Sequence, residues 1–286
     1  MIQLGEIQIA LVSDGTVHVD AGGPFGLVPR ALYRHILEPD ADNLVPMTLT
    51  CLLVRAGGKT IVVDTGLGEK LTDRMRATWN LIRPRGGLLD ALARHGVRAE
   101  DVDLVINTHL HGDHCAGNTV FGSSFEDVRP TFPNAEYVVQ RREYQDAMQP
   151  NERTRSTYFA VNYDPLVQSG QMRLLDGDTE IAPGIHGVVT PGHTPGHMSI
   201  RFESGGQHAL FVSDLASYAV HFERLAWMTA YDVEPLVTLE SKRRWQAWAL
   251  ETGALLIFQH DPKTPVGHLI RQGDRVRIEP VNVGQA

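Results

Sequence analysis

Residues 108–117 read THLHGDHCAG, and this stretch is the strongest single indication of what the chain builds. Four ligand-type side chains fall within six positions: His109, His111, Asp113 and His114. His109 ends DLVINTH (103–109), an apolar run typical of a buried strand, and the other three follow it. Packing groups that are costly to desolvate brings little benefit unless a cation binds them. The pattern therefore predicts a metal site.

The spacing indicates how one loop can serve two ions. In a tight turn after the strand at 103–107, alternate side chains can point inward, so His109, His111 and Asp113 converge while His114 points elsewhere. Imidazole and carboxylate ligands suit zinc, and manganese, iron and cobalt accept the same set. We interpret the next residue, Cys115, as a small packing residue rather than a thiolate ligand.

Further candidates follow other apolar runs. Asp214 ends LFVSD with a carboxylate that can bridge two cations, and His260 lies at the end of LLIFQHD. The repeat TPGHTPGH contains His193 and His197, and the spacing alone does not say which of them binds a metal. Asp64, in VVDTG, occupies a similar strand-end position, and we interpret it as a carboxylate that orients a ligand histidine.

Strand and helix signals alternate along the chain. Apolar β-branched runs predict strands at 7–15, 48–66 (two strands joined at Gly57–Gly58), 103–109, 136–140, 185–193, 198–214 and 254–261. Helical periodicity is found at 88–96, 141–149 and 238–253. We expect two sheets covered by helices, an α+β fold, in a single domain spanning residues 1–286. Its N-terminal arm, the apolar and aperiodic segment 21–36, either covers the core or forms a pocket lip or dimer contact.

Composition excludes several classes of protein. A chain of 286 residues with 42% hydrophobic residues can bury a sizeable core. Its net charge of −8, without any block of Lys or Arg, argues against a nucleic-acid partner. Two cysteines are too few for a disulfide framework. The first residues show neither a signal peptide nor an apolar run long enough to span a membrane, so we expect a cytoplasmic protein without a membrane partner.

Five short motifs together resemble those of the metallo-β-lactamase superfamily: DTG (64–66), THLHGDH (108–114), GHTPGH (192–197), SD (213–214) and QHD (259–261). The resemblance implies a four-layer αββα sandwich and a dinuclear metal centre. One metal would be held by His109, His111 and His193, the other by Asp113, His114 and His260, with Asp214 bridging them. The resemblance thus favours His193 as the ligand, and places His197 behind the ligands.

Two stretches outside the metal motifs, together with the region of His260, resemble a branch of that superfamily. They are LVSDGTVHVDAGGPFGLVPRALY (11–33) and MTAYDVEPLVTLESKRRWQAW (228–248). They look like those of bacterial quorum-quenching N-acyl homoserine lactonases and their methyl parathion hydrolase-like relatives. This implies a homodimer that opens a lactone or similar ester by attack of a metal-bound hydroxide on the carbonyl, with two divalent ions, zinc being the expected one. Those lactonases carry a catalytic tyrosine three residues after the bridging aspartate, where this chain has Ser217 followed by Tyr218.

Several side chains are expected to act on the substrate. Asp113 would steer the nucleophile and pass a proton to the leaving alkoxide, while Tyr218 or His221 would hydrogen-bond the oxyanion or the leaving group. Apolar residues of two segments are expected to line an acyl pocket, although they serve equally well as core or dimer contacts: Phe25, Leu27, Val28, Leu32, Tyr33, Trp227 and Met228.

Other activities remain as alternatives. A phosphotriesterase, hydrolysing organophosphates, would use the same pair of metals. A glyoxalase II-like thioesterase shares GHTPGH, but only residues 261–286 follow His260, which is short for a glutathione-binding extension. Asp214 disfavours a true β-lactamase, and the acidic charge disfavours an RNase Z-like nuclease. From a different class, a non-hydrolytic diiron redox protein usually has glutamate in place of His111.

Overall fold

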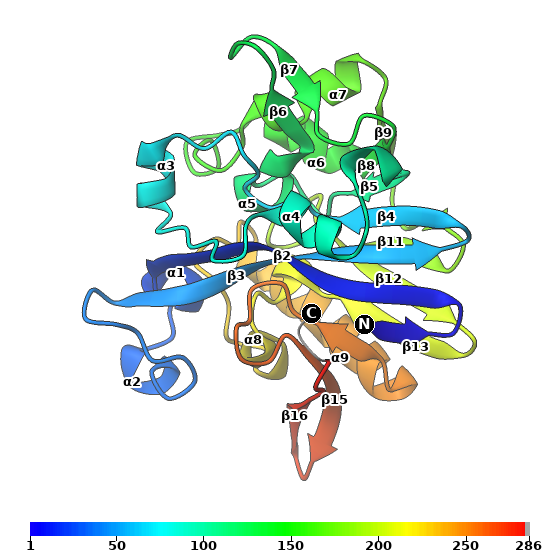
Figure 1. Cartoon of the computed structure of the whole chain (residues 1–286). Coiled ribbons are helices and arrows are strands. Elements are labelled where there is room, and N and C mark those ends of the chain that lie inside the picture. The colour runs from blue at the N-terminus through cyan, green and yellow to red at the C-terminus, as the bar shows by residue number, and fades with distance from the viewer. Residues whose placement is uncertain (284–286) are drawn as a thin grey trace.

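Two seven-stranded β-sheets lie face to face in the computed structural model, which describes residues 1–283 (Figure 1). The first sheet has the order β1-β2-β3-β4-β5-β8-β9, with bounds β1 (Ile2–Leu4), β2 (Ile7–Asp20), β3 (Leu44–Ala56), β4 (Lys59–Val63), β5 (Leu104–Ile106), β8 (Glu136–Gln140) and β9 (Met172–Leu175). The second sheet runs in sequence order, through β10 (Thr179–Ala182), β11 (Ile185–Val189), β12 (Met198–Ser204), β13 (Gln207–Phe211), β14 (Leu255–Ile257), β15 (Val266–Gln272) and β16 (Arg275–Pro280). A separate hairpin pairs β6 (Thr119–Phe121) with β7 (Val128–Pro130).

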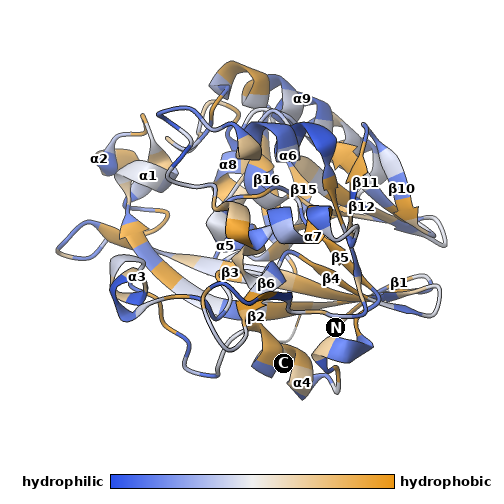
Figure 2. Cartoon of the chain, turned by 90° about the horizontal axis from the view of Figure 1, so that it is seen from above, coloured by the Kyte–Doolittle hydropathy of each residue, from blue (hydrophilic) through white to orange (hydrophobic). Residues whose placement is uncertain are grey.

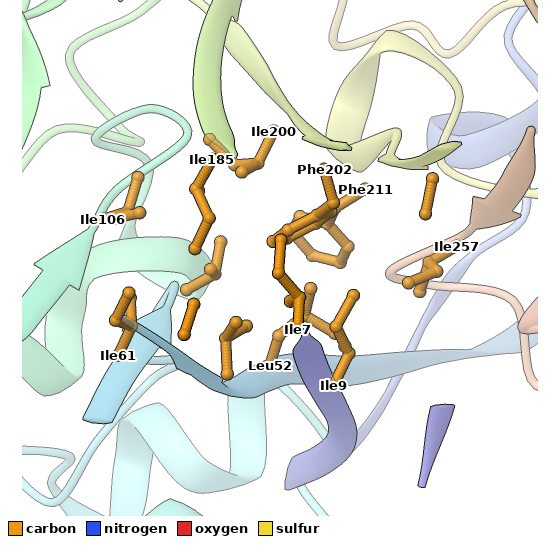
Figure 3. Packing of buried hydrophobic residues seen from close by; sticks show 14 of the residues in the cluster. Ile7, Ile9, Leu52, Ile61, Ile106, Ile185, Ile200, Phe202, Phe211 and Ile257 are labelled. Carbon is orange, nitrogen blue, oxygen red and sulfur yellow. The ribbon is translucent and has the colours of Figure 1, made fainter. Parts of the chain in front are cut away.

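The alternation of side chains along each strand gives the sheets two apolar faces. In β3, Leu52 and Val54 point into the space between the sheets, whereas Cys51 and Leu53 point to the helices outside. Figure 3 shows the inner layer, where isoleucines of the first sheet such as Ile61 face side chains of the second. Burying this apolar surface is the main favourable term in folding, so the inner layer holds the two sheets together.

Helices cover the outer face of each sheet. On the first sheet lie α4 (Leu88–Arg94), α6 (Arg141–Met148) and α7 (Asp164–Gln168), and on the second α8 (Ala219–Glu223) and α9 (Pro235–Thr252). Figure 2 shows hydrophobic residues concentrated on the strands between the helical layers, with hydrophilic residues along α6 and much of α9. The predicted α+β fold, a four-layer αββα sandwich, is confirmed. None of the helices within residues 1–283 is long and apolar enough to cross a membrane.

The remaining helical segments are short. They are α1 (Gly22–Phe25), α2 (Arg30–Tyr33), α3 (Asp73–Thr78) and α5 (Gly112–Cys115), with 3-10 turns η1 (Ala99–Asp101), η2 (Ala116–Asn118), η3 (Ala160–Asn162) and η4 (Ser213–Leu215). The expected arm, residues 21–36, thus contains two helical turns, α1 and α2, within an otherwise irregular path. Its side chains form an apolar cluster with Tyr218, Val220 and Trp227.

Turn chemistry explains most of the element boundaries that the sequence predicts. The hairpin between β3 and β4 turns at Gly57 and Gly58, with φ angles of 55° and 76° that glycine adopts without strain. Helix α9 ends at Gly253, in the left-handed conformation typical of a helix C-terminus. It begins three residues before the predicted start, because Pro235 is already suited to the first helical position.

Candidate metal centre

The candidate ligands lie where strands of both sheets end. In the first sheet β4 and β5 are parallel neighbours, and in the second sheet β13 and β14 are. Parallel neighbours end at the same edge of a sheet. Asp64 and the segment 108–114 follow one pair, Asp214 and His260 follow the other, and His193 follows β11. Five segments that are far apart in the sequence therefore meet at one rim.

Three groups of side chains at this rim are close enough to hold metal ions, with all ligand atoms of a group within 4.8 Å of one another. The groups are His109, His111 and His193; Asp113, His114 and His260; and His109, His114 and Asp214. All seven residues that the sequence proposes as ligands are included. The third group overlaps the other two, which makes one continuous cluster.

Asp214 lies between the first two groups. Its Oδ2 is 3.2 Å from His193 Nε2 and 3.4 Å from His114 Nε2, and its Oδ1 is 3.1 Å from His260 Nε2. Ser217 Oγ donates a hydrogen bond of 3.0 Å to Oδ1. Burial alone would raise the pKa of Asp214, but the surrounding histidines hold it well below its ordinary value. The result is an ionised carboxylate that faces ligands of both groups.

Asp113 differs from the arrangement that simple alternation predicts. Its Oδ2 lies 3.7 Å from His114 Nε2 and 3.9 Å from His260 Nε2, so Asp113 groups with these two and not with His109 and His111. The reason is local, because the chain turns into helix α5 at Gly112 and the extended alternation ends there.

Asp64 orients His114. Its Oδ2 is 3.0 Å from His114 Nδ1, which leaves Nε2 facing the cluster. Asp64 also accepts hydrogen bonds from the Thr108 amide and hydroxyl, each of 2.8 Å. These bonds hold Asp64 at a φ of 56°, a conformation uncommon for a residue with a side chain. Asp64 thus bonds a candidate ligand histidine from behind.

Asp232 plays the corresponding part for His193, and sequence reasoning did not find it. Its Oδ1 is 3.0 Å from His193 Nδ1 and accepts a hydrogen bond of 2.9 Å from Thr229 Oγ1. Asp232 is buried, although it follows no strand and belongs to no ligand motif. Its only signal in the sequence is its position within the lactonase-like stretch 228–248.

The other histidines of the cluster are fixed by a backbone contact or kept neutral by burial. His260 Nδ1 is 2.7 Å from the carbonyl of Thr48, and Thr48 donates its amide to the His260 carbonyl at 3.2 Å. Burial, and then the neighbouring histidines, lowers the pKa of His109 and of His111 well below the ordinary value. Both are therefore neutral at pH 7, which is the form that binds a metal.

Two buried nitrogens of the cluster have no hydrogen-bond partner in the described structure, Nε2 of His114 and Nε2 of His260. A buried polar atom without a partner costs about 1–3 kcal/mol, so it calls for an explanation. Imidazole nitrogens and carboxylate oxygens converging within coordination distance are the donor set that borderline divalent cations prefer. The residues present therefore fit metal ions.

His197 lies behind the candidate ligands. Its Nε2 accepts a hydrogen bond of 3.2 Å from the Asp214 amide, and its Nδ1 is 3.2 Å from the Thr190 carbonyl. Burial, with a smaller effect from His193, lowers the pKa of His197 to about 3, so the ring is neutral. It belongs to none of the ligand groups.

Glu143 is a second buried carboxylate that sequence reasoning missed. It accepts hydrogen bonds from the Leu110 amide at 3.0 Å, from the Tyr158 hydroxyl at 2.9 Å and from the Thr194 hydroxyl at 2.6 Å. Leu110 belongs to the metal-binding loop, and Thr194 follows His193. Glu143 thus joins the loops that carry ligands from the two sheets.

Comparison with known proteins now identifies the family. The sequence matches the Metallo-beta-lactamase superfamily over residues 46–257. The chain belongs to this superfamily. A curated N-acyl homoserine lactonase of Bacillus cereus is 27% identical to it over 246 residues, which covers 82% of this chain and 89% of that protein. The expectation that this member of the superfamily is a metal-dependent hydrolase resembling the lactonases is confirmed.

Solved structures support the same family. A probable metal-dependent hydrolase from Staphylococcus aureus superposes with a TM-score of 0.87 at 26% identity, covering 99% of this chain and all of that one. AidC, a dizinc quorum-quenching lactonase solved with a product bound, gives a TM-score of 0.81 at 22% identity, covering 99% of this chain and 97% of that one. At that identity AidC shows the shared fold alone.

In this metallo-β-lactamase superfamily member, the rings of Tyr218 and His221 pack against each other and against Phe25 of the arm. The Tyr218 hydroxyl donates a hydrogen bond of 3.0 Å to the Pro46 carbonyl, and its ring stacks on Phe25 with the ring centroids 5.7 Å apart. Both ring nitrogens of His221 are buried without a hydrogen-bond partner in the described structure. Burial, and then the charge of Lys242, lowers the pKa of His221 to about 3. Neither side chain joins a ligand group, and their catalytic roles stay predictions.

The expected pocket residues fall into three sets. Three of them, Phe25, Tyr33 and Trp227, are buried in the aromatic cluster of the arm. Val28 and Met228 are half-buried, and Leu27 and Leu32 are exposed. The rings of Phe25 and Tyr33 stack with centroids 4.4 Å apart, which makes them packing residues in this structure. Cys115 lies in the core beneath the first sheet's helices, with its Sγ 3.2 Å from the Leu110 carbonyl.

Proposed function

We propose that the protein is a dinuclear metal-dependent lactonase that opens N-acyl homoserine lactones. The observation that carries the proposal is the position of Asp214, whose Oδ2 lies near His193 of one group and His114 of the other, while its Oδ1 lies near His260. One carboxylate shared between two ligand groups is the arrangement that a pair of ions requires. The lactone substrate is supported by the curated relatives, which are N-acyl homoserine lactonases aligned over most of both chains.

Seven residues would hold the two ions, for which zinc is the expected metal: His109, His111 and His193 on one side, Asp113, His114 and His260 on the other, with Asp214 shared. When bound, such a pair lowers the pKa of water toward neutrality and polarises a carbonyl group. The protein supplies ligand geometry, because Asp64, Asp232 and the Thr48 carbonyl each fix one imidazole.

Asp113 is the group that we propose for proton transfer. Its side chain is 15% exposed, more than that of the other ligands at the cluster, so it borders the side from which a substrate approaches. When water opens the ring, one proton has to reach the ring oxygen that leaves as an alcohol. A partly exposed carboxylate beside the cluster can accept that proton from the attacking water and pass it on.

We further propose a cytoplasmic homodimer. Both cysteines, Cys51 and Cys115, are free and buried, which fits a reducing compartment. The arm presents Leu27, which is fully exposed, and Leu32, which is half exposed, and apolar side chains of this kind favour a contact with a second copy.

The decisive experiment measures ring opening and metal content on the same sample. Homoserine lactones of several acyl lengths are offered to protein loaded with zinc, and proton release is followed. We expect turnover with two ions per chain, and a loss of about 10³-fold or more in the Asp214→Ala variant, together with a lower metal content. A fully loaded wild type that opens none of the lactones contradicts the proposal, and turnover of an organophosphate in the same panel would then support phosphotriester hydrolysis instead.

A further inference from the structure

Thr108 is a buried residue whose hydroxyl group joins ligand-bearing segments of both sheets. It precedes His109 in the loop that follows β5. Three polar atoms surround its Oγ1: Asp64 Oδ2 at 2.8 Å, Ser213 Oγ at 3.0 Å and His109 Nδ1 at 3.1 Å. A hydroxyl group has one proton and two lone pairs, so it donates to only one of these neighbours. The neighbour that receives the proton decides what the other two must do.

The proton of the Thr108 hydroxyl goes to Asp64. A carboxylate oxygen accepts hydrogen bonds, and donors surround this one, since the Thr108 amide donates to Oδ1 at 2.8 Å and His114 Nδ1 lies 3.0 Å from Oδ2. Hydrogen bonds to a carboxylate are about twice as strong as those between neutral groups. Ser213 competes poorly, because it has a proton of its own, which it can direct to Thr108 Oγ1 or to Gln259 Oε1, each 3.0 Å away. Thr108 therefore donates to Asp64 and has only lone pairs left.

These lone pairs in turn determine where His109 carries its proton. His109 Nδ1 can bond Thr108 Oγ1 only as a donor, so the ring proton is on Nδ1. In a neutral imidazole the other nitrogen, Nε2, then has a free lone pair, which is the form that binds a metal. Nε2 is the atom of His109 that faces the cluster, 3.1 Å from His111 Nδ1 and 3.9 Å from Asp214 Oδ2. The contact with Thr108 thus frees the nitrogen that a metal needs.

The hydroxyl of Thr108 is the one hydrogen-bond partner of His109 Nδ1 within residues 1–283. Without this hydroxyl, the ring proton can move to Nε2, where His111 Nδ1 lies at hydrogen-bond distance. A proton on Nε2 would occupy the position that a metal ion needs. Loss of the hydroxyl should therefore weaken metal binding even if the ring itself does not move.

Asp64 consequently acts on two ligand histidines. It bonds His114 directly through Oδ2, and it reaches His109 through Thr108. The two histidines belong to the two ligand groups between which Asp214 lies. Asp64 and Thr108 are close because β4 and β5 are parallel neighbours, which end at the same edge of the sheet.

We propose that Thr108 is a positioning residue that extends the effect of Asp64 to His109, so that a single carboxylate prepares one histidine for each metal ion. The proposal rests on the two-ion part of the proposed function and not on the identity of the substrate. Loss of the Thr108 hydroxyl should weaken the binding of one ion, whereas loss of the Asp64 carboxylate should weaken the binding of both.

The test measures zinc affinity, by competition with a chelator, in Thr108→Val, which has nearly the same volume but no hydroxyl group. We expect the affinity for one of two ions to fall about 10- to 100-fold, and that for the other to change less than about threefold. Thr108→Ser keeps the hydroxyl and should stay within about threefold of the wild type for both ions. Thr119→Val is the matched control, since Thr119 is equally buried and donates to the Val161 carbonyl at 2.9 Å. It should bind both ions as the wild type does.

Asp64→Asn tests the direct and the relayed effect together. We expect it to weaken the binding of both ions about 10- to 100-fold. The double variant Asp64→Asn/Thr108→Val should bind no more weakly than Asp64→Asn alone, since Thr108 acts through Asp64. Losses that simply add in the double variant would overturn the relay.

A second measurement locates the ring proton and does not depend on the folding of the valine variant. In protein stripped of metal and labelled with ¹⁵N-histidine, two-bond proton–nitrogen correlations distinguish a proton on Nδ1 from one on Nε2. For His109 we expect the proton on Nδ1 in the wild type and in Thr108→Ser, and on Nε2 in Thr108→Val. A merely structural role of Thr108 would leave the proton where it is.

The outcomes separate this proposal from the proposed function. A Thr108→Val variant within about twofold of the wild type for both ions overturns the role of Thr108, as does a Thr108→Ser variant that binds as weakly as Thr108→Val. A wild-type His109 with its proton on Nε2 overturns it as well. A protein that binds two ions in this Thr108-dependent way but opens no lactone contradicts the proposed substrate alone. A wild type that binds fewer than two ions contradicts both proposals.

Discussion

The metal-binding rim and the arm over residues 21–36 are held in place by opposite kinds of contact. At the rim each histidine has a specific polar partner, such as Asp64 for His114 or Asp232 for His193. In the arm Phe25 is fixed by apolar contact with Tyr33 and Trp227. A hydrogen bond needs a donor and an acceptor at the right distance, so few residue types can replace either partner. An apolar contact tolerates other apolar side chains of similar volume. The identity of each residue is therefore more tightly constrained at the rim than in the arm.

The largest effect is expected in the arm's core. Phe25→Ala removes a side chain that is 1% exposed and packs against four rings, so the free energy of unfolding should fall by about 3–5 kcal/mol. Chemical denaturation measures this, and the metal content of the folded protein should stay normal because no ligand contacts the ring. A loss below 1 kcal/mol with an altered preference for acyl length would instead make Phe25 a pocket residue, and would remove the contrast between the two regions.

Asp232→Ala tests whether the rim depends on its polar partners. Without the carboxylate, His193 Nδ1 loses its hydrogen bond, and the affinity for metal should fall about 10- to 100-fold. Competition with a chelator measures the affinity. Asp176→Ala is the control, since Asp176 pairs with Arg141 at the surface, away from the ligands. Equal affinities for the two variants would contradict the proposed role of Asp232.

Two glycines of the metal-binding loop provide a matched pair. A Cβ atom at Gly117 would be 2.1 Å from the Thr65 carbonyl oxygen, whereas one at Gly112 would meet Phe159 at 3.4 Å, an ordinary contact. Gly117→Ala should therefore cost about 1–3 kcal/mol of stability, and Gly112→Ala much less. Thermal unfolding of both variants checks the difference. Similar melting temperatures would show that the backbone at the rim adjusts more easily than its hydrogen bonds indicate.

The smallest effect on stability is expected from Leu27→Ser. This side chain is fully exposed, so the free energy of unfolding should change by no more than about 0.5 kcal/mol. If Leu27 contacts a second copy of the chain, sedimentation should show a weaker dimer. If it is a pocket lip, KM for long acyl chains should rise instead. A change in neither would leave Leu27 as an ordinary surface residue.

The candidate ligands could be selected from the sequence because their chemistry is unusual at each position. His109, Asp214 and His260 are polar residues at the ends of apolar strands, and such positions have few structural explanations. The fold followed from the same strands, whose alternation and glycine turns are local properties. The grouping of Asp113 could not be obtained in this way, because it depends on where helix α5 begins.

The supporting residues escaped prediction for a physical reason. Asp232 and Glu143 act through partners 39 and 33 to 51 positions away, and nothing in the flanking sequence marks them. A single carboxylate of this kind is also common on a solvated surface, so only the folded chain shows which of them is buried beside a candidate ligand.

The hydrogen bonds of Glu143 have a consequence for how the ions exchange. Because Glu143 bonds Leu110 on one ligand loop and Thr194 on the other, the two halves of the site are joined by the protein itself. The loops need not become ordered each time an ion binds, so metal binding costs little conformational entropy. Such a protein can gain or lose its metals while staying folded. Its activity would then follow the supply of metal in the cell, and would return on resupply without refolding.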